Sequence, residues 1–471
     1  MKYIITNRFF PFIWMTLSLF IFYNYADYTE YDQNLVILLA VLTYYFTLLN
    51  WMLTGNRVFS IFTTFALLSL LFNLGQSILH AFTNFPIIGL VYSKYSPSDI
   101  FYMLKYQLIC AAGLYLGSSL YLSKKKNRVS LYEFSSYYKT YNNFDIFKSR
   151  EVILEILLYV SFAVTLIYSV YQINLSQNLS YSELYETRET VSEFYSFGAI
   201  IFGLYFIFQK RHIKLVLGGW IWFFLSFYIT GTRVLGLVYM GALIFVLPII
   251  YPQHFQKKFI SIWIIGLILG LTSFNIISQI RQGDSSSSLS EESNIIFLLF
   301  NSINEMGFSQ TSTQTTIDYI KQGGEHKQTI LYNILMGVIP SDWLNELVPK
   351  EWSDVSLGKW ATEQEVGPNA SYGLGYSWIA ESYMNFGSWG WIFTLIYGYF
   401  IAFAENYSLK RIMKGDYLIA ICLIAILCKQ IFFVRAQLNL VIPFYKATIY
   451  LLIFRFLFLQ KRKQFKQLIN L

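Results

Sequence analysis

Three arginines stand where the charge pattern of a membrane protein does not usually place them. Arg233 lies in the tight turn Gly231-Thr232-Arg233, Arg281 follows a long apolar stretch, and Arg435 lies in a short segment between two apolar stretches. Charged residues within or next to membrane-spanning segments cost free energy and are usually retained for function. The guanidinium group is a planar fork that matches phosphate oxygens, so these positions predict an anion-binding site.

Lys105, Lys429 and Lys446 extend this set, because each falls inside an apolar stretch. Lysine supplies a point charge where arginine supplies a fork. The simpler alternative for any one of these cations is that it reaches the lipid headgroups or pairs with an acid. Several cations converging on one cavity would suit a pyrophosphate, and the size of the set favours such a site.

Glu381 is the carboxylate of a glycine-flanked aromatic segment, residues 372–387. A carboxylate in such a half-buried place suits a general base, and it suits equally the structural partner of an arginine. His80, at the end of an apolar stretch, is a second candidate base, although a histidine there is more often a hydrogen-bonded interface residue. No His, Cys or Asp cluster has metal-ligand spacing, and no P-loop or dinucleotide motif occurs, so we expect no metal and no cofactor.

The composition predicts the elements that must position these residues. Of the 471 residues, 55% are hydrophobic and only 13% are charged, whereas soluble domains average about 25% charged residues. Apolar runs of roughly 20 residues are long enough to cross a bilayer. Because the runs are continuous, they predict helices and not the strands of a barrel. The net charge of +8 arises from loop Lys and Arg and is no argument for nucleic acid binding.

The fold class is therefore an all-α polytopic membrane protein with about 12 transmembrane helices. We expect the spans near residues 9–25, 34–54, 58–80, 100–122, 152–173, 194–210, 213–229, 233–251, 259–280, 386–404, 416–434 and 439–459. Lys and Arg gather in alternate loops, which predicts cytoplasmic N- and C-termini and puts Arg233, Arg281 and Arg435 outside.

Three parts follow from this topology. Residues 1–280 are expected to form an N-terminal bundle of about nine helices, with a cytoplasmic loop at 123–151. Residues 281–385 form one large extracytoplasmic loop, in which four tryptophans argue against disorder. Residues 386–471 form about three C-terminal helices and a basic cytoplasmic tail.

A family resemblance lies in residues 375–390, above all in Ala380-Glu381-Ser382-Tyr383-Met384-Asn385-Phe386-Gly387. This segment resembles the signature of Wzy-type polymerases, which join the oligosaccharide repeat units of O-antigen and capsule. The turn at residues 231–233 and the exit at Arg281 into a large outer loop are similar too. One departure is that Ile244 stands where some relatives place a glycine, after ten residues that follow the arginine.

The resemblance implies a membrane glycosyltransferase of GT-C type in the bacterial cytoplasmic (inner) membrane. Its substrates would be undecaprenyl-pyrophosphate-linked oligosaccharides, and its partners the lipid bilayer, a chain-length regulator and a flippase. It implies a pyrophosphate site at the cations named above and a base at Glu381 or His80. The implied glycan-binding residues are aromatic: Trp343, Trp352, Trp360, Tyr376, Trp378 and Tyr383.

Two other functions are compatible with the sequence. A lipid-linked oligosaccharide flippase or other transporter would more often show internal repeats and charges at the midplane. The other alternative is the related ligase, which moves finished glycan onto another acceptor. The charges of this chain gather on the outer half, which favours a transferase over a transporter.

Overall fold

The computed structural model describes residues 60–83, 94–122, 151–178, 190–230, 233–251, 295–339, 341–349, 356–368, 374–414 and 417–438, with single residues beside them. Four expected spans lie almost entirely outside these ranges, namely those near 9–25, 34–54, 259–280 and 439–459. Arg281 and Trp352 lie outside them too. The count of 12 spans is therefore an expectation.

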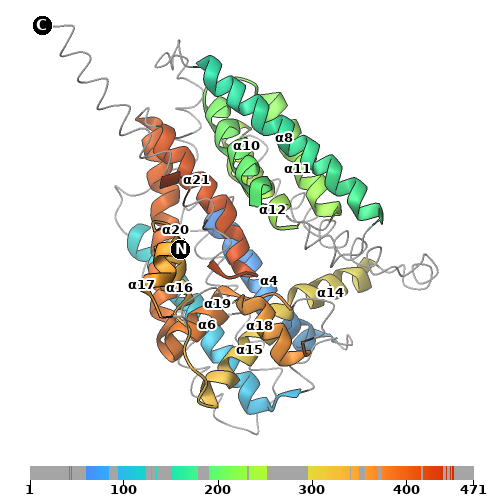
Figure 1. The fold of residues 1–471 in the computed structure, drawn as a ribbon. Coiled ribbons are helices and arrows are strands. Elements are labelled where there is room, and N and C mark those ends of the chain that lie inside the picture. The colour runs from blue at the N-terminus through green and yellow to red at the C-terminus, as the bar shows by residue number, and fades with distance from the viewer. Residues whose placement is uncertain are drawn as a thin grey trace, which may run out of the picture.

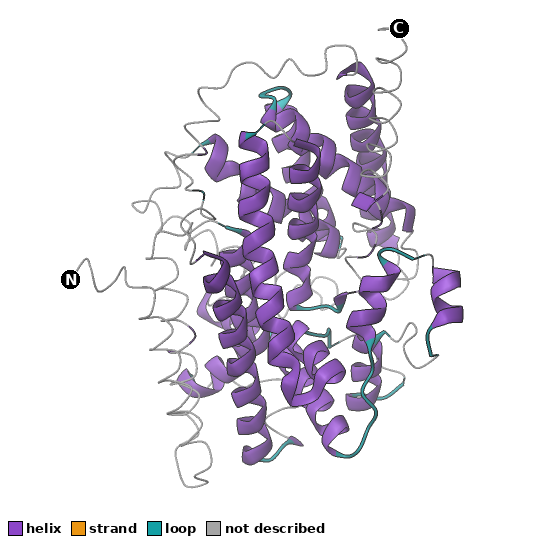
Figure 2. Ribbon diagram, turned by 90° about the vertical axis from the view of Figure 1, so that its left-hand side faces the viewer, coloured by secondary structure: helices purple, strands orange, loops and turns teal. Residues whose placement is uncertain are grey.

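The described chain is built from helices. In order they are α4 (Ile61–Phe82), α6 (Pro97–Leu122), α8 (Glu151–Asn178), α10 (Thr190–Phe208), α11 (Ile213–Ile229), α12 (Arg233–Ile250), α14 (Ile295–Met306), α15 (Phe308–Lys321), α16 (Thr329–Met336), α17 (Ser341–Leu347), α18 (Leu357–Glu365), α19 (Trp378–Phe386), η6 (Gly387–Trp389), α20 (Gly390–Met413), α21 (Tyr417–Gln430) and η7 (Ile431–Val434). Figure 2 shows helices and connecting loops throughout the described part, with no strand.

Helices that fit a membrane occur where apolar stretches predicted them. Among the described residues, four helical segments are long and apolar enough to span: Ile61–Phe82, Pro97–Leu122, Glu155–Ser176 and Trp378–Met413. Shorter apolar helices are Tyr195–Phe208, Ile213–Ile229, Val238–Ile250 and Leu418–Val434. The described chain is thus an all-helical protein with the helices of a membrane protein, as the composition predicts.

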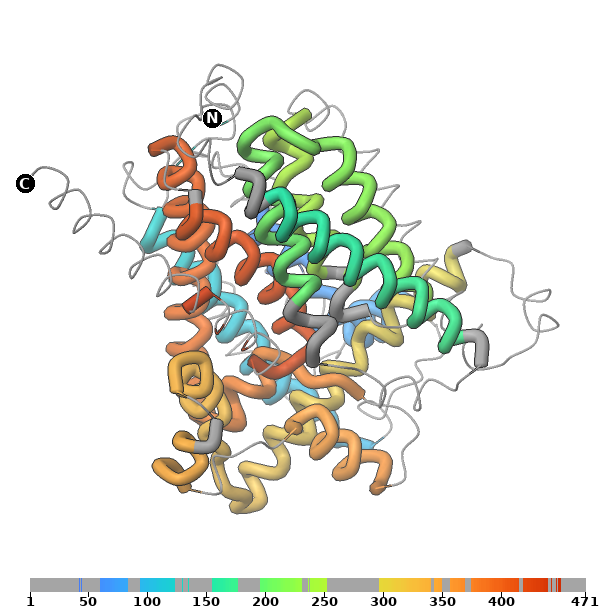
Figure 3. Tube along the Cα trace, turned by 45° about the horizontal axis from the view of Figure 1, so that its top comes forward, coloured from blue at the N-terminus to red at the C-terminus, as the bar shows by residue number. Residues whose placement is uncertain are grey.

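The long helices form two groups. Helices α8, α10, α11 and α12 lie side by side in green at one side of the molecule, and α4, α6, α20 and α21 form the other group (Figures 1 and 3). Helix α21 joins the two groups, because it packs against α10 and α12 as well as α20.

Glycines bring α6 and α20 into backbone contact. A Cβ at Gly117 would lie 1.9 Å from the carbonyl oxygen of Leu395, and one at Gly398 would lie 2.0 Å from that of Leu114. Gly113 stands four residues before Gly117, one helical turn away, and meets Thr394. Small residues at this spacing let membrane helices approach closely, so dispersion contacts along the seam hold the pair together.

The stretch expected as one outer loop contains most of the short helices. Helices α14 to α19 lie between mid-height and the lower end of the molecule as Figure 1 draws it, with α15 and α18 towards the lower end. Helix α15 is central, since it packs against α4, α6, α18 and α19. Helix α19 then leads through η6 into α20, which attaches this end of the molecule to the long helices.

Candidate functional site

The segment 374–377, directly before α19, is held by hydrogen bonds from two sides. The hydroxyl of Ser312 on α15 donates to the carbonyl oxygen of Gly375 at 2.6 Å. The backbone N–H of Tyr376 donates to the carbonyl oxygen of Arg435 at 3.2 Å. Ser377 caps α19, because its hydroxyl accepts the N–H of Ala380 at 3.0 Å. These bonds place the family-like segment beside the turn that carries Arg435.

Arg435 packs across a glycine that has no room for a side chain. Gly375 has φ +76°, and a Cβ there would lie 3.0 Å from Nε and 3.1 Å from Cγ of Arg435. On α4, the ring of Phe72 lies 5.6 Å from the Arg435 guanidinium carbon, a cation–π distance. Gly375 therefore packs against the stem of Arg435 and Phe72 lies beside its guanidinium group, while the residue is only partly buried.

Glu381 is fully buried and both of its carboxylate oxygens are occupied. Oε1 accepts the hydroxyl of Thr329 at 3.0 Å, and Oε2 accepts the backbone N–H of Leu438 at 2.8 Å. The side chain of Asn385, one turn later, donates to Thr329 and accepts the N–H of Ile330. Glu381 thus joins α16 and α19 to the turn after η7.

The other predicted cations are described to different extents. Lys429 is fully buried within α21, six residues before Arg435, and Lys105 is partly buried in α6. Lys446 is partly buried, Arg233 is the first residue of α12, and Arg281 lies outside the described residues. The structure therefore connects Glu381 to the turn that carries Arg435, and a single cavity for all of the cations stays a prediction.

The predicted aromatic residues occupy different environments. Tyr376 and Trp378 are buried, and their polar atoms bond protein groups: the Tyr376 hydroxyl lies 2.9 Å from that of Thr316, and Trp378 Nε1 donates to Ser69 at 3.0 Å. Tyr383 is buried too, its ring edge-on to Tyr106 and its hydroxyl 3.2 Å from that of Tyr102.

Two tryptophans and the candidate histidine lie further out. Trp360 on α18 packs edge-on against Tyr319, and Trp343 on α17 is 67% exposed. His80 lies in the last turn of α4 and is partly exposed. The described residues hold no group of three His, Cys, Asp or Glu side chains arranged for a metal ion.

The sequence argument missed the polar side chains of α15. From Ser309 to Thr316 every residue is an uncharged polar one, and all of them are buried. This run of eight such residues in a helix was the signal that could have found it, because buried polar groups need partners.

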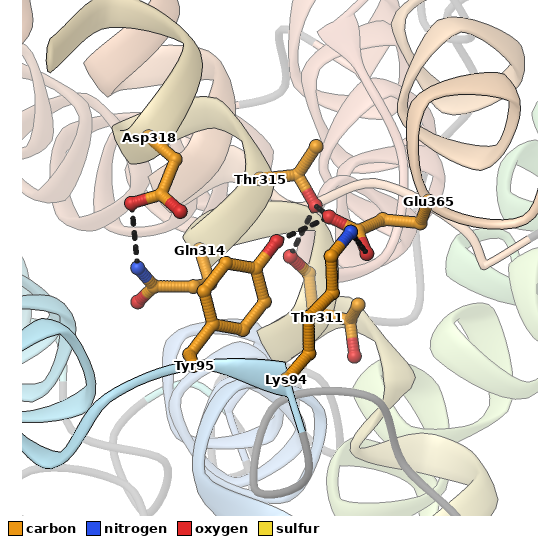
Figure 4. A network of polar contacts seen from close by, with 7 residues as sticks. All are labelled: Lys94, Tyr95, Thr311, Gln314, Thr315, Asp318 and Glu365. Atoms are coloured by element: carbon orange, nitrogen blue, oxygen red, sulfur yellow. Dashed lines mark hydrogen bonds and ion pairs between the residues drawn. The ribbon is translucent and has the colours of Figure 1, made fainter. Parts of the chain in front are cut away.

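One face of α15 meets a carboxylate from α18 (Figure 4). Glu365 accepts the Thr315 hydroxyl at 2.7 Å and the ammonium group of Lys94 at 2.8 Å, and it also accepts the hydroxyl of Tyr95. Burial, followed by this hydrogen bond, raises the pKa of Tyr95 well above its usual value. On the same face Gln314 Nε2 donates to Asp318 at 3.0 Å. Burial and the negative charge of Asp99 raise the pKa of Asp318.

Comparison with known families gives one match, to the O-antigen polysaccharide polymerase Wzy family, over residues 10–466. No curated protein and no solved structure matches the chain. The match covers nearly the whole chain and confirms the resemblance seen in residues 375–390. Members of this family are membrane proteins and polymerising glycosyltransferases, in keeping with the apolar helices of this chain. The protein therefore belongs to the Wzy family of O-antigen polysaccharide polymerases.

Proposed function

We propose that the protein joins undecaprenyl-pyrophosphate-linked oligosaccharide repeat units at the outer face of the bacterial cytoplasmic membrane. The growing glycan would move from its lipid pyrophosphate to a terminal sugar hydroxyl of an incoming lipid-linked unit. Family membership supports polymerisation, and the guanidinium of Arg435 beside the family-like segment is the observation that carries the choice of donor.

The reaction exchanges one bond to the anomeric carbon for another. The bond from that carbon to the pyrophosphate oxygen breaks, and a glycosidic bond to the acceptor hydroxyl oxygen forms. The lipid pyrophosphate leaves with the electron pair, and the hydroxyl proton passes to a base. Negative charge therefore develops on the leaving group, and cations aimed at it would lower the barrier.

The proposed pyrophosphate site consists of Arg233, Arg281, Arg435, Lys105, Lys429 and Lys446. Arg435 is best placed to contribute a bidentate contact, because Gly375 packs against its stem and Phe72 lies beside its guanidinium group. Pre-ordering a flexible side chain in this way lowers the entropy lost when the ligand binds.

The base is proposed to be Glu381 or His80. Glu381 lies next to the Arg435 turn, although its oxygens are engaged by Thr329 and Leu438. His80 is the alternative base, because it is partly exposed and histidine as a residue type suits proton transfer near neutral pH. Trp343, Trp352, Trp360, Tyr376, Trp378 and Tyr383 are proposed to help shape the path of the glycan, and a flippase and a chain-length regulator are proposed partners.

A surface-glycan gel from a deletion strain tests the proposal. The wild-type gene should restore a ladder of long chains, whereas Arg233→Ala, Arg281→Ala and Arg435→Ala should leave single repeats with protein still present in the membrane. Arg435→Lys should also fail if its contact is bidentate. Lys359→Ala is the control, because the side chain of this lysine is 76% exposed and pairs with Glu363 on its own helix.

The outcomes separate the alternatives. Single repeats on the final anchor in the deletion strain indicate a polymerase. Long unattached chains indicate a ligase, and loss of all outward-facing glycan indicates a flippase. Long chains in all three arginine variants would overturn the pyrophosphate site.

A further inference from the structure

We propose that the face of α15 formed by Thr311, Gln314, Thr315 and Asp318 binds hydroxyl groups of the acceptor oligosaccharide. The ligand class is a hydroxyl-rich glycan without a phosphate. The inference rests on the proposed function, because it assigns that reaction's second substrate to a defined surface.

The four residues share one helix face. Their spacing of three, four and seven residues from Thr311 puts them on a single stripe. Tyr95 and Glu365 lie beside this stripe in the network of polar contacts that Figure 4 shows, where Glu365 accepts hydrogen bonds from Thr315 and Tyr95. The stripe therefore presents a hydroxyl, an amide and a carboxylate together, which are groups that pair with adjacent sugar hydroxyls.

Two atoms of this face have no hydrogen-bond partner among the described residues. They are the hydroxyl of Thr311 and the amide oxygen of Gln314, and both residues are fully buried. A buried polar atom without a partner costs free energy, so such atoms call for a ligand or water. Sugar hydroxyls donate and accept hydrogen bonds and would satisfy both.

The other threonines of α15 make a hydrogen bond to their own helix that Thr311 does not make. The hydroxyls of Thr313, Thr315 and Thr316 each donate to the carbonyl oxygen four residues earlier, at 3.1, 2.8 and 2.7 Å. Thr311 makes no such bond among the described residues. Its hydroxyl is therefore left unbonded within the described part of the protein, although a backbone carbonyl oxygen one turn earlier is the usual acceptor for a helical threonine.

The stripe meets solvent at its rim. The Lys94 side chain is 48% exposed, and Asp318 is partly exposed. Nearby, Lys321 lies 3.7 Å from Asp99 and sits over the ring of Tyr102. A glycan would thus enter past charged groups and an aromatic ring.

Helix α15 also connects this stripe to Arg435. Ser312 bonds Gly375, the residue against which Arg435 packs. Asp318 follows six residues later, about 9 Å along the helix axis. One rigid helix therefore relates the proposed acceptor surface to the proposed pyrophosphate site.

The test is binding to the full-length protein in detergent, measured by calorimetry with two probes. One probe is the lipid-free oligosaccharide repeat unit released by mild acid from a polymerase-deletion strain, and the other is inorganic pyrophosphate. Thr311→Val and Gln314→Leu should weaken oligosaccharide binding by roughly threefold to tenfold, the worth of one neutral hydrogen bond. Pyrophosphate binding should be unchanged in both variants.

Thr313→Val is the matched control, because it makes the same atomic change on the opposite face. Its hydroxyl donates to the carbonyl oxygen of Ser309 and lies 3.1 Å from the hydroxyl of Ser377, so this variant should lower Tm and leave oligosaccharide affinity unchanged. Thr311→Val and Gln314→Leu binding the oligosaccharide like wild type would overturn the inference. Absence of oligosaccharide binding by wild type at millimolar concentration would overturn it too. Neither result bears on the surface-glycan gel, which decides the proposed function separately.

Discussion

The carboxylate of Glu381 accepts the backbone N–H of Leu438 at 2.8 Å, across 57 residues of sequence. This bond attaches α19 to the turn that begins at Arg435. The same turn is held by Tyr376, which donates to Arg435, and by the backbone N–H of Leu357, which donates to Gln437 at 2.6 Å. The family-like segment and the arginine are therefore one structural unit.

Substitutions at Glu381 should separate its anchoring role from catalysis. Gln keeps an oxygen for Leu438 and turns an amide NH2 toward Thr329, whose hydroxyl oxygen can accept it. We expect Glu381→Gln to lower the free energy of unfolding by about 1 kcal/mol. Glu381→Ala should lower it further, because a buried hydrogen-bond donor without an acceptor costs about 1–3 kcal/mol. Thermal unfolding in detergent measures both. Folded Glu381→Gln that makes only single repeats would support a base; full-length chains from it would assign the proton transfer to another group.

Gly375→Ala should shorten the glycan chains, because the new side chain would displace Arg435. Its left-handed backbone costs an L side chain about 1–2 kcal/mol, and the new methyl group would displace the arginine. Gly323→Ala is the control, since Gly323 has φ +88° with no atom within 4 Å of a Cβ. We expect similar losses of Tm and a shorter ladder only for Gly375→Ala. Identical ladders from the two variants would show that Arg435 tolerates the displacement.

The sequence predicted the helical class and most of the described long helices, because apolar runs of membrane length have few other solutions. It also singled out Arg435 and Glu381, although not the backbone bond at Leu438 that relates them. Hydrogen bonds between distant segments leave no periodic pattern. The polar face of α15 was missed because its burial comes from helices that are distant in the sequence, and a run of Ser, Thr and Gln does not show which neighbours cover it.

Asp318 should make stability depend on pH. Burial and Asp99, with a smaller contribution from Glu365, raise its pKa, and Gln314 and Lys321 oppose the shift. The folded protein then holds this proton more tightly than the unfolded chain. The free energy of unfolding therefore falls as pH rises from the usual value of 3.8 through the raised pKa, and it stays lower above it.

Asp318→Asn removes the loss of stability that ionisation of Asp318 causes, and the asparagine side chain keeps an oxygen that can accept the hydrogen bond from Gln314. We expect its Tm to exceed that of wild type at pH 7 and the difference to vanish below the usual pKa of an aspartate. Thermal unfolding across this pH range measures it. A Tm difference that is the same at every pH would contradict the assignment to Asp318.

Gly117→Ala should separate α6 from α20. The added methyl group would overlap the Leu395 carbonyl oxygen at 1.9 Å, and backbone cannot move aside cheaply. Gly218→Ala is the control on α11, where a Cβ meets no atom within 4 Å. We expect a large loss of Tm or of folded yield for Gly117→Ala and none for Gly218→Ala. Equal behaviour of the two variants would show that the helix contact is dispensable.

The contact of α6 with α20 also decides which parts can move. Helices whose backbones are in contact have no layer of side chains between them that could repack, so this pair should move as one rigid body. Helix α19, which carries Glu381, leads through η6 directly into α20 and is therefore part of the same rigid unit. We expect any opening that admits or releases a glycan to come from displacement of α16 to α18, or of α8 and α10 to α12, about this stationary pair.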